Sequence, residues 1–122
     1  MIRVLIADDH MLLREGLKLI LSDTEDIVVV AEASDGQEVL DKVEKNNLDV
    51  IVLDINMPRK TGVEVLAELK AGGNKIPVLI LSTYSAEDYK DLAIREGASG
   101  YLSKEEAPEL LIDAIRDVFQ NK

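Results

Sequence analysis

Short apolar runs alternate with amphipathic, helix-like stretches along the whole chain, with one pair about every 25 residues. Five runs have the length and the β-branched content of strands, namely residues 2–7, 27–32, 49–54, 76–81 and 100–102. A strand followed each time by a helix is typical of a parallel sheet with helices on both faces. Because crossovers between parallel strands are right-handed, five such units favour a doubly wound α/β sheet. The sequence therefore predicts one (βα)5 domain over residues 1–122.

Start and stop signals for helices fall between the predicted strands. The first helix is expected at 11–21, where leucine and isoleucine recur at helical spacing. Serine or threonine three residues before an acidic or amide side chain predicts a capped helix start, and glycine predicts a helix end. These signals are Ser34 with Gln37, Thr61 with Glu64, Gly72 with Gly73, Ser85 with Asp88, Gly97, and Pro108 at the start of the last helix. Ser85 and Gly97 would bound a fourth helix at 85–96.

The composition limits the possible functions. The 122 residues include 24 acidic and 14 basic side chains, for a net charge of −10, and no cysteine. A surface of that sign repels a phosphate backbone, so we expect no direct binding of nucleic acid. The lack of cysteine excludes disulfides, thiolate metal sites and cysteine nucleophiles. No apolar run approaches the length that spans a bilayer, and no signal peptide is recognisable, so we expect a soluble cytoplasmic protein without membrane contact.

Polar side chains follow the predicted strands at their carboxyl ends. They are Asp8 and Asp9 after the first strand, Asp54 after the third, Ser82 and Thr83 after the fourth, and Ser103 and Lys104 after the fifth. In a doubly wound sheet these ends share one edge. Two carboxylates about 5 Å apart repel by about 3 kcal/mol at an effective dielectric of about 20, so three of them need a cation or a retained proton. Oxygen ligands favour Mg²⁺ or Mn²⁺, and a carboxylate beside a metal and an ammonium can act as a phosphoryl acceptor.

Each of these residues also has a simpler interpretation. Asp54 can be a turn residue or a helix cap, and Asp8 or Asp9 can cap the first helix. Ser82 can be an ordinary turn residue, and Lys104 can be a solvated surface lysine. Their convergence on one edge of the predicted sheet favours the interpretation in terms of cation and phosphoryl binding.

Several motifs together resemble the signature of response-regulator receiver domains, which are CheY-like. They are Asp8-Asp9, Asp54 followed by Met57-Pro58 and Gly62, Ser82-Thr83, and the segment Gly100-Tyr101-Leu102-Ser103-Lys104. Residues 8–17 and 97–102 are similar to the NarL/FixJ-type subfamily. The resemblance covers essentially the whole chain, and it implies a flavodoxin-like five-stranded sheet of order 2-1-3-4-5 with five helices.

The resemblance implies a phosphoacceptor and a metal site. Asp54 would accept a phosphoryl group from the phosphohistidine of a sensor histidine kinase. Asp9 would bind Mg²⁺ (or Mn²⁺) directly, and Asp8 would bind it mainly through water. Asn56 would offer its backbone carbonyl to the metal, and its side chain would influence dephosphorylation.

The resemblance also implies residues that act on the phosphoryl group or respond to it. Lys104 would pair with the phosphoryl group, and Ser82 would hydrogen-bond one of its oxygens. Tyr101 would be an aromatic switch that moves inward with Ser82, although ordinary half-buried packing also explains a tyrosine there. Thr83 and Tyr84 would line the entrance and tune the lifetime of the phosphoryl group.

One position departs from the family pattern. Many receiver domains have a proline, joined by a cis bond, after the lysine, and this chain has Glu105. A cis bond without proline costs about 3 kcal/mol, so the backbone after Lys104 is left open. His10 and Arg14 are interpreted as structural or surface residues rather than chemical ones. Gly62 is interpreted as a backbone requirement at a helix start.

The resemblance implies a switch that assists its own phosphorylation rather than an enzyme. The expected partners are a sensor histidine kinase and, after phosphorylation, a second copy of the chain. Candidate contacts are the outer faces of 85–96 and the last helix, with Met11, Leu12, Leu19, Ile112 and Phe119. Family members of this type usually carry a LuxR-type helix-turn-helix domain, through which DNA binding and transcription control would act. That domain is absent from this sequence, so we expect a truncated receiver in preference to a stand-alone regulator.

Two other functional classes compete with the switch. A Mg²⁺-dependent phosphohydrolase of the haloacid-dehalogenase-like pattern would have a second aspartate two residues after the nucleophile, where this chain has Asn56. A flavin or nucleotide binder on the same fold would have a Gly-rich loop after the first strand, and the sequence has none. Turnover of a phosphomonoester would favour the hydrolase, and stoichiometric, base-labile labelling would favour the switch.

Overall fold

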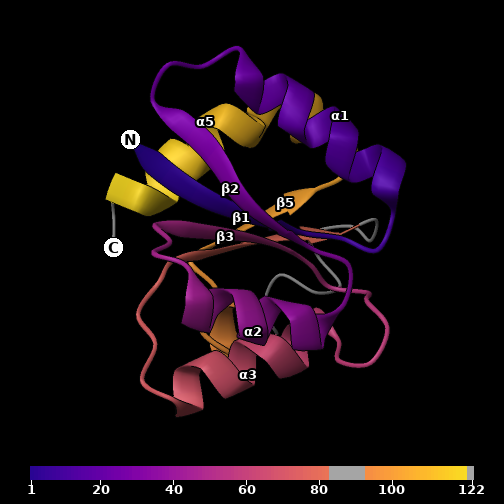
Figure 1. Ribbon diagram of the computed structural model, residues 1–122, viewed down its shortest axis with the longest axis vertical. Coiled ribbons are helices and arrows are strands. Elements are labelled where there is room, and N and C mark those ends of the chain that lie inside the picture. Colours follow the sequence, from indigo (N-terminus) through magenta and orange to yellow (C-terminus); the bar gives the residue numbers. More distant parts are fainter. Residues whose placement is uncertain (83–92, 121–122) are drawn as a thin grey trace.

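The computed structural model describes residues 1–82 and 93–120, and its centre is a parallel five-stranded sheet (Figure 1). The strand order is β2-β1-β3-β4-β5, which confirms the predicted doubly wound topology. The strands are β1 (Ile2–Ala7), β2 (Ile27–Ala33), β3 (Val50–Asp54), β4 (Val78–Ser82) and β5 (Gly100–Ser103). All four neighbouring pairs are parallel, so all five carboxyl ends lie at one edge of the sheet.

Helices cover both faces of the sheet, as Figure 1 shows. The described helices are α1 (Met11–Ser22), α2 (Gly36–Lys45), α3 (Gly62–Ala71) and α5 (Ala107–Gln120). α1 and α5 lie on one face, and α2 and α3 lie on the other. Ser85 and Asp88, the expected caps of the fourth helix, lie outside the described residues. Gly97, its expected end, has a φ of 107°, a conformation that favours glycine.

Two apolar clusters fill the space between the sheet and the two helix layers. Alternate residues of β1 point to opposite faces, so Val4 and Ile6 join one cluster and Leu5 joins the other. Every residue of β3 and β4 is buried, which explains why these strands are uniformly apolar up to their last residue. Each fully buried leucine or isoleucine contributes about 1.5–3 kcal/mol, so the packed sheet is a rigid base for its carboxyl edge.

The capping signals were partly correct. Thr61 and Glu64 form the predicted capping box at the start of α3. The predicted pair of Ser34 with Gln37 was wrong, because Asp35 caps α2 and accepts a hydrogen bond from the backbone N–H of Glu38 at 2.9 Å. Asp35 follows Ser34 by one position, and its carboxylate reaches a free backbone N–H of the first turn. Asp35 is therefore the N-cap that was predicted to be Ser34.

Gly62 is required for space rather than for a positive φ. A Cβ atom at this position would lie 2.6 Å from the carbonyl oxygen of Asp54 and 2.7 Å from the Cα of Ile55. The backbone N–H of Gly62 also donates to the carbonyl oxygen of Ile55 at 2.9 Å. The start of α3 therefore packs directly against the backbone that carries Asp54.

Within residues 1–82 and 93–120, none of the helices combines the length and the apolar character needed to cross a bilayer.

Candidate functional site

Backbone hydrogen bonds hold the polar residues at the carboxyl ends of the strands. The N–H of Asp8 donates to Ala33 at 3.0 Å, and the N–H of Lys104 donates to Ser82 at 2.8 Å. Both bonds continue the strand ladders by one residue. Asp54, the last residue of β3, pairs with Leu81 of β4. The edge predicted from the sequence is therefore built on fixed backbone.

The Lys104 ammonium lies between two carboxylates. Its Nζ is 2.9 Å from Oδ2 of Asp8 and 3.3 Å from Oδ2 of Asp54. The side chains of Asp8 and Asp54 are 1% and 2% exposed, and that of Lys104 is 12% exposed. In the described part of the chain, the buried polar or charged residues are Asp8, Asp54 and Ser82, all at this edge.

This cluster has an excess of negative charge that affects its protonation. Burial raises the pKa of the Asp54 carboxyl to about 6, and the neighbouring charge of Asp8 adds to the effect. Lys104 and the backbone N–H of Asn56, which lies 3.3 Å from Oδ1 of Asp54, act in the opposite direction. Burial opposes the charged form of Lys104, but its contacts with Asp8 and Asp54 outweigh burial and raise its pKa. A single ammonium does not fully compensate two buried carboxylates.

Asp9 and His10 complete a group of possible metal ligands. One donor atom from each of Asp8, Asp9, His10 and Asp54 lies within 4.8 Å of the others. Nδ1 of His10 is 3.1 Å from Oδ1 of Asp8 and 3.2 Å from Oδ1 of Asp9. His10 was interpreted as a structural or surface residue, and its side chain is indeed exposed, but its Nδ1 also contacts both predicted metal ligands, a contact that the interpretation did not include. The position of His10 directly after two predicted ligands was the signal that could have identified this contact.

The residues fit a hard divalent cation. Oδ2 of Asp8 and Oδ2 of Asp54 are fully buried and make no well-directed hydrogen bond with the described residues, although both contact the Lys104 ammonium. Carboxylate oxygens with spare acceptor capacity are the ligands that Mg²⁺ prefers in proteins. Asp8, Asp9 and Asp54 can therefore hold such an ion and relieve the excess charge.

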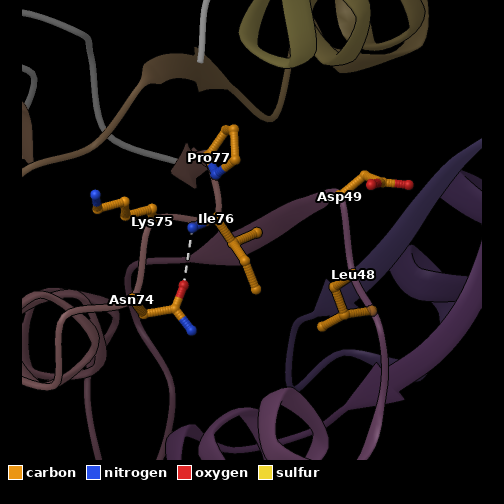
Figure 2. A pocket seen from close by; sticks show the side chains of 6 residues that line it. All are labelled: Leu48, Asp49, Asn74, Lys75, Ile76 and Pro77. Carbon is orange, nitrogen blue, oxygen red and sulfur yellow. Dashed lines mark hydrogen bonds between the residues drawn. The ribbon is translucent and has the colours of Figure 1, made fainter.

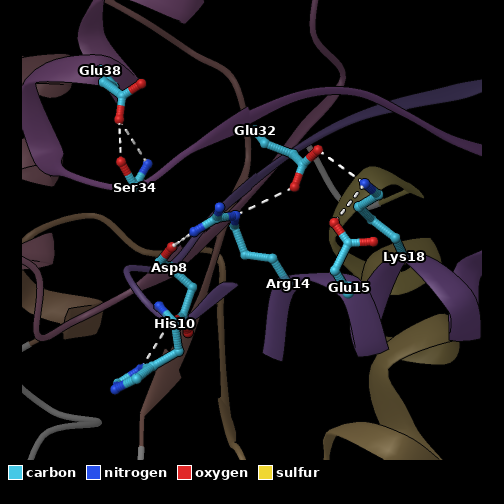
Figure 3. A network of polar contacts seen from close by, with 8 residues as sticks. All are labelled: Asp8, His10, Arg14, Glu15, Lys18, Glu32, Ser34 and Glu38. Atoms are coloured by element: carbon cyan, nitrogen blue, oxygen red, sulfur yellow. Dashed lines mark hydrogen bonds and ion pairs between the residues drawn. The ribbon is translucent and has the colours of Figure 1, made fainter. Parts of the chain in front are cut away.

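Arg14 ties the turn after β1 to α1 and β2 (Figure 3). Its Nη1 donates to the backbone carbonyl of Asp8 at 2.6 Å, and its Nε donates to Oε1 of Glu32 at 3.3 Å. Nζ of Lys18 donates to Oε2 of Glu32 at 3.0 Å and to Oε1 of Glu15 at 3.1 Å. Arg14 is structural, as predicted, and what it fixes is the backbone of a candidate ligand.

A comparison with models of protein families identifies the family of this chain. The model of the response regulator receiver domain matches residues 4–116. The chain belongs to this family. The predicted resemblance to receiver domains is thereby confirmed.

The curated relatives of this receiver domain include proteins named as transcriptional regulators. The chain is 44% identical over 119 residues to the transcriptional regulatory protein DegU of Brevibacillus brevis, covering 98% of this chain and 50% of that protein. It is 41% identical over 122 residues to the transcriptional regulatory protein DesR of Bacillus subtilis, covering 100% of this chain and 60% of that protein. The receiver domain therefore spans between half and three fifths of the length of these relatives.

The solved structures similar to this receiver domain include regulators of the NarL and LuxR types. The receiver domain of the putative response regulator NarL from Mycobacterium tuberculosis aligns with a TM-score of 0.93 and 31% identity, covering 99% of this chain and 98% of that chain. A LuxR-family DNA-binding response regulator from Staphylococcus aureus aligns with a TM-score of 0.90 and 30% identity, covering 98% and 99%. The chain is thus the receiver domain of a two-component response regulator of the NarL type.

The remaining predicted site residues differ in where they lie. Ser82 is fully buried at the end of β4, and Asn56 is exposed beside Asp54. Tyr101 is half-buried and packs against the apolar cluster on the side of α2 and α3. Thr83 and Tyr84 lie outside the described residues. The functional roles given to these five residues stay predictions.

The backbone after Lys104 accommodates glutamate in place of proline. No peptide bond among the described residues is cis, so the bond between Lys104 and Glu105 is trans. Oγ of Ser103 donates to Oε1 of Glu106 at 2.9 Å, and the N–H of Glu106 approaches Oγ of Ser103 at 3.3 Å. This reciprocal pair closes the turn that leads into α5, and Lys104 still points at the two aspartates.

A groove of about 470 Å³ lies at the opposite edge of the sheet, before β3 and β4 (Figure 2). It is lined by Leu48, Asp49, Asn74, Lys75, Ile76 and Pro77. The N–H of Ile76 donates to Oδ1 of Asn74 at 2.8 Å, and Oδ2 of Asp49 accepts from the N–H of Arg3 at 2.8 Å. These polar groups satisfy the local backbone, so the groove offers no cluster comparable to the one around Asp54.

Proposed function

We propose that Asp54 of this receiver domain accepts a phosphoryl group from the phosphohistidine of a sensor histidine kinase. A carboxylate oxygen of Asp54 forms the new P–O bond, and the P–N bond of the donor breaks with its electron pair left on the imidazole. The observation that carries this proposal is the position of Asp54, buried at the end of β3 with Oδ2 3.3 Å from the Lys104 ammonium.

The neighbours of Asp54 have the chemistry that phosphoryl transfer needs. Lys104 supplies positive charge where the transferred group gathers negative charge. Asp8 and Asp9, together with the backbone carbonyl of Asn56, would hold Mg²⁺ or Mn²⁺. When bound, the ion neutralises charge on the phosphoryl oxygens and on the carboxylates. The proposal makes Asp54 a stoichiometric acceptor rather than the nucleophile of a hydrolase with turnover.

The proposed outcome of phosphorylation is a change of surface. Ser82 would hydrogen-bond the new phosphoryl oxygen, Tyr101 would move inward with it, and Thr83 and Tyr84 would tune its lifetime. A phosphoryl group that favours one of two packings shifts the population of the whole domain. The altered surface would favour a homodimer and, through a LuxR-type DNA-binding domain of the full-length cytoplasmic regulator, would control transcription.

Phosphorylation by a small donor tests the proposal. The chain incubated with acetyl phosphate or phosphoramidate and Mg²⁺ should gain one phosphoryl group per chain, detected by intact mass. Asp54→Asn should abolish the gain, and the matched control Asp49→Asn, at the opposite edge of the sheet, should leave it unchanged. Labelling that survives Asp54→Asn, or continuous release of phosphate from a phosphomonoester, would overturn the assignment.

A further inference from the structure

The imidazole of His10 faces two carboxylates of the acidic cluster. Its Nδ1 lies 3.1 Å from one carboxylate oxygen of Asp8 and 3.2 Å from one of Asp9. Ionised carboxylates only accept hydrogen bonds, so three lone pairs would repel one another if the space between these atoms were empty. That space is suited to either a proton on Nδ1 or a metal cation.

The separations also match those between neighbouring ligands of one metal ion. Adjacent ligands of an octahedral ion with bonds of about 2.1 Å lie about 3 Å apart. The two distances from His10 are close to that value, and an oxygen of Asp54 lies within 4.8 Å of the same donor atoms. One nitrogen and three oxygen donors therefore surround a common space.

We propose that His10 is a nitrogen ligand of the divalent-cation site, and that it shifts the preference of the site from Mg²⁺ toward Co²⁺ and Ni²⁺. Imidazole suits the later divalent ions of the first transition row, whereas Mg²⁺ prefers oxygen. An imidazole that binds a metal through Nδ1 carries its proton on Nε2. This inference depends on the cation site of the proposed function, although not on phosphoryl transfer.

The side chain of His10 is placed so that it can act without disturbing the fold. It is 68% exposed, and α1 begins at the next residue without a side-chain cap from His10. Replacing His10 by phenylalanine keeps a ring of similar shape and removes both nitrogens. The variant His10→Phe should fold as the parent does, so changes in metal binding report on the nitrogen itself.

Electron spin-echo spectroscopy of bound Mn²⁺ tests the contact directly. His10 is the single histidine of the chain, so imidazole ¹⁴N coupling to Mn²⁺ can arise only from this residue in protein without a histidine tag. We expect ¹⁴N coupling of a directly bound imidazole in the parent chain and none in His10→Phe. Mn²⁺ bound to the parent chain without that coupling would overturn the proposal.

Calorimetric titration with Mg²⁺ and Ni²⁺ measures the preference. His10→Phe should weaken Ni²⁺ binding by about tenfold or more, since removing even a group that only supports a ligand typically weakens metal affinity by about that factor. The same variant should change Mg²⁺ binding by less than about twofold. The control Asp9→Asn should weaken both ions. Equal losses for both ions in His10→Phe would mean that His10 only orients the carboxylates. Failure of the parent to bind either ion would overturn the cation site of the proposed function itself.

Discussion

Two groups of ion pairs in this receiver domain both join a basic side chain to aspartate, but one group is buried and the other is exposed to solvent. At the carboxyl edge of the sheet, Lys104 contacts Asp8 and Asp54, whose side chains are almost fully buried. On the surface, Arg116 of α5 makes a two-pronged contact with Asp26, with nitrogen–oxygen distances of 2.8 and 2.9 Å. The side chains of Arg116 and Asp26 are 39% and 47% exposed.

The pKa values of the carboxyl groups are shifted in opposite directions in the two groups of ion pairs. The hydrogen bond from Arg116 lowers the pKa of Asp26 below its ordinary value. Here one guanidinium stabilises the charged form of a single, exposed carboxylate. At Asp54, burial and the charge of Asp8 raise the pKa to about 6 although Lys104 is present. The surface pair fastens α5 to the turn before β2. The buried group keeps an uncompensated negative charge that a bound cation could neutralise, and this charge lowers the stability of the metal-free fold.

Removing the buried ammonium should give the largest effect. Lys104→Met keeps an unbranched side chain of similar length but leaves Asp8 and Asp54 without their cation. At pH 7.5 without divalent ions, we expect a loss of about 4 kcal/mol in the free energy of unfolding, measured with urea. The loss should shrink at pH 5, where protonation of Asp54 removes much of the repulsion.

Lys60 offers a matched control for this substitution. Its Nζ contacts both carboxylate oxygens of Glu68 at 2.7 Å, but the pair lies at the surface. Lys60→Met should change the free energy of unfolding by no more than about 0.5 kcal/mol. If Lys60→Met and Lys104→Met destabilise the chain equally, burial is not what distinguishes the two groups.

Neutralising Asp54 should stabilise the metal-free domain. Asp54→Asn keeps the shape of the side chain and removes one of the two buried negative charges. The folded pKa of Asp54 is raised from 3.8 to about 6, so the parent loses stability as the pH rises through this window. The interval corresponds to about 3 kcal/mol. The free energy of unfolding of the variant, measured with urea, should therefore exceed that of the parent by an amount that approaches about 3 kcal/mol above pH 7 and vanishes only at pH values well below 3.8.

Divalent ions should reverse this advantage. Mg²⁺ at saturating concentration supplies the missing positive charge, so it should stabilise the parent more than Asp54→Asn. The unfolding midpoint of both proteins with and without Mg²⁺ at pH 7.5 measures the difference. A variant that is less stable than the parent at pH 7.5 without metal would contradict the picture of an uncompensated buried charge.

The sequence was sufficient for the topology and for most of the acidic edge. Strictly alternating apolar runs allow few arrangements, and the parallel sheet brings Asp8, Asp54 and Lys104 together from remote parts of the chain. The limits of the first strand were predicted as observed, and those of the other four differ by one or two residues at one or both ends, because strand ends depend on pairing that the apolar pattern does not encode.

Features that depend on three-dimensional contact were missed. Ser34 and Asp35 are both good caps, and only the backbone path decides that Asp35 reaches the N–H of Glu38. Gly62 was predicted as a backbone requirement at a helix start, but the sequence does not show that this requirement comes from the neighbouring backbone of Asp54. The ring orientation that brings His10 to the acids is likewise set by side-chain rotation and not by sequence spacing.

The surface pair should give the smallest effect, and salt should remove it. Arg116→Met breaks the contact with Asp26 while it keeps most of the aliphatic stem of the side chain. Because water solvates both partners after the substitution, the loss in unfolding midpoint should be much smaller than that of Lys104→Met. In about 1 M NaCl, Arg116→Met and the parent should have the same unfolding midpoint, because the Debye length at that concentration is only about 3 Å and exposed charges are strongly screened. A loss that persists in high salt would show that Arg116 stabilises the domain by packing, and the surface group would then differ from the buried one in more than its exposure to water.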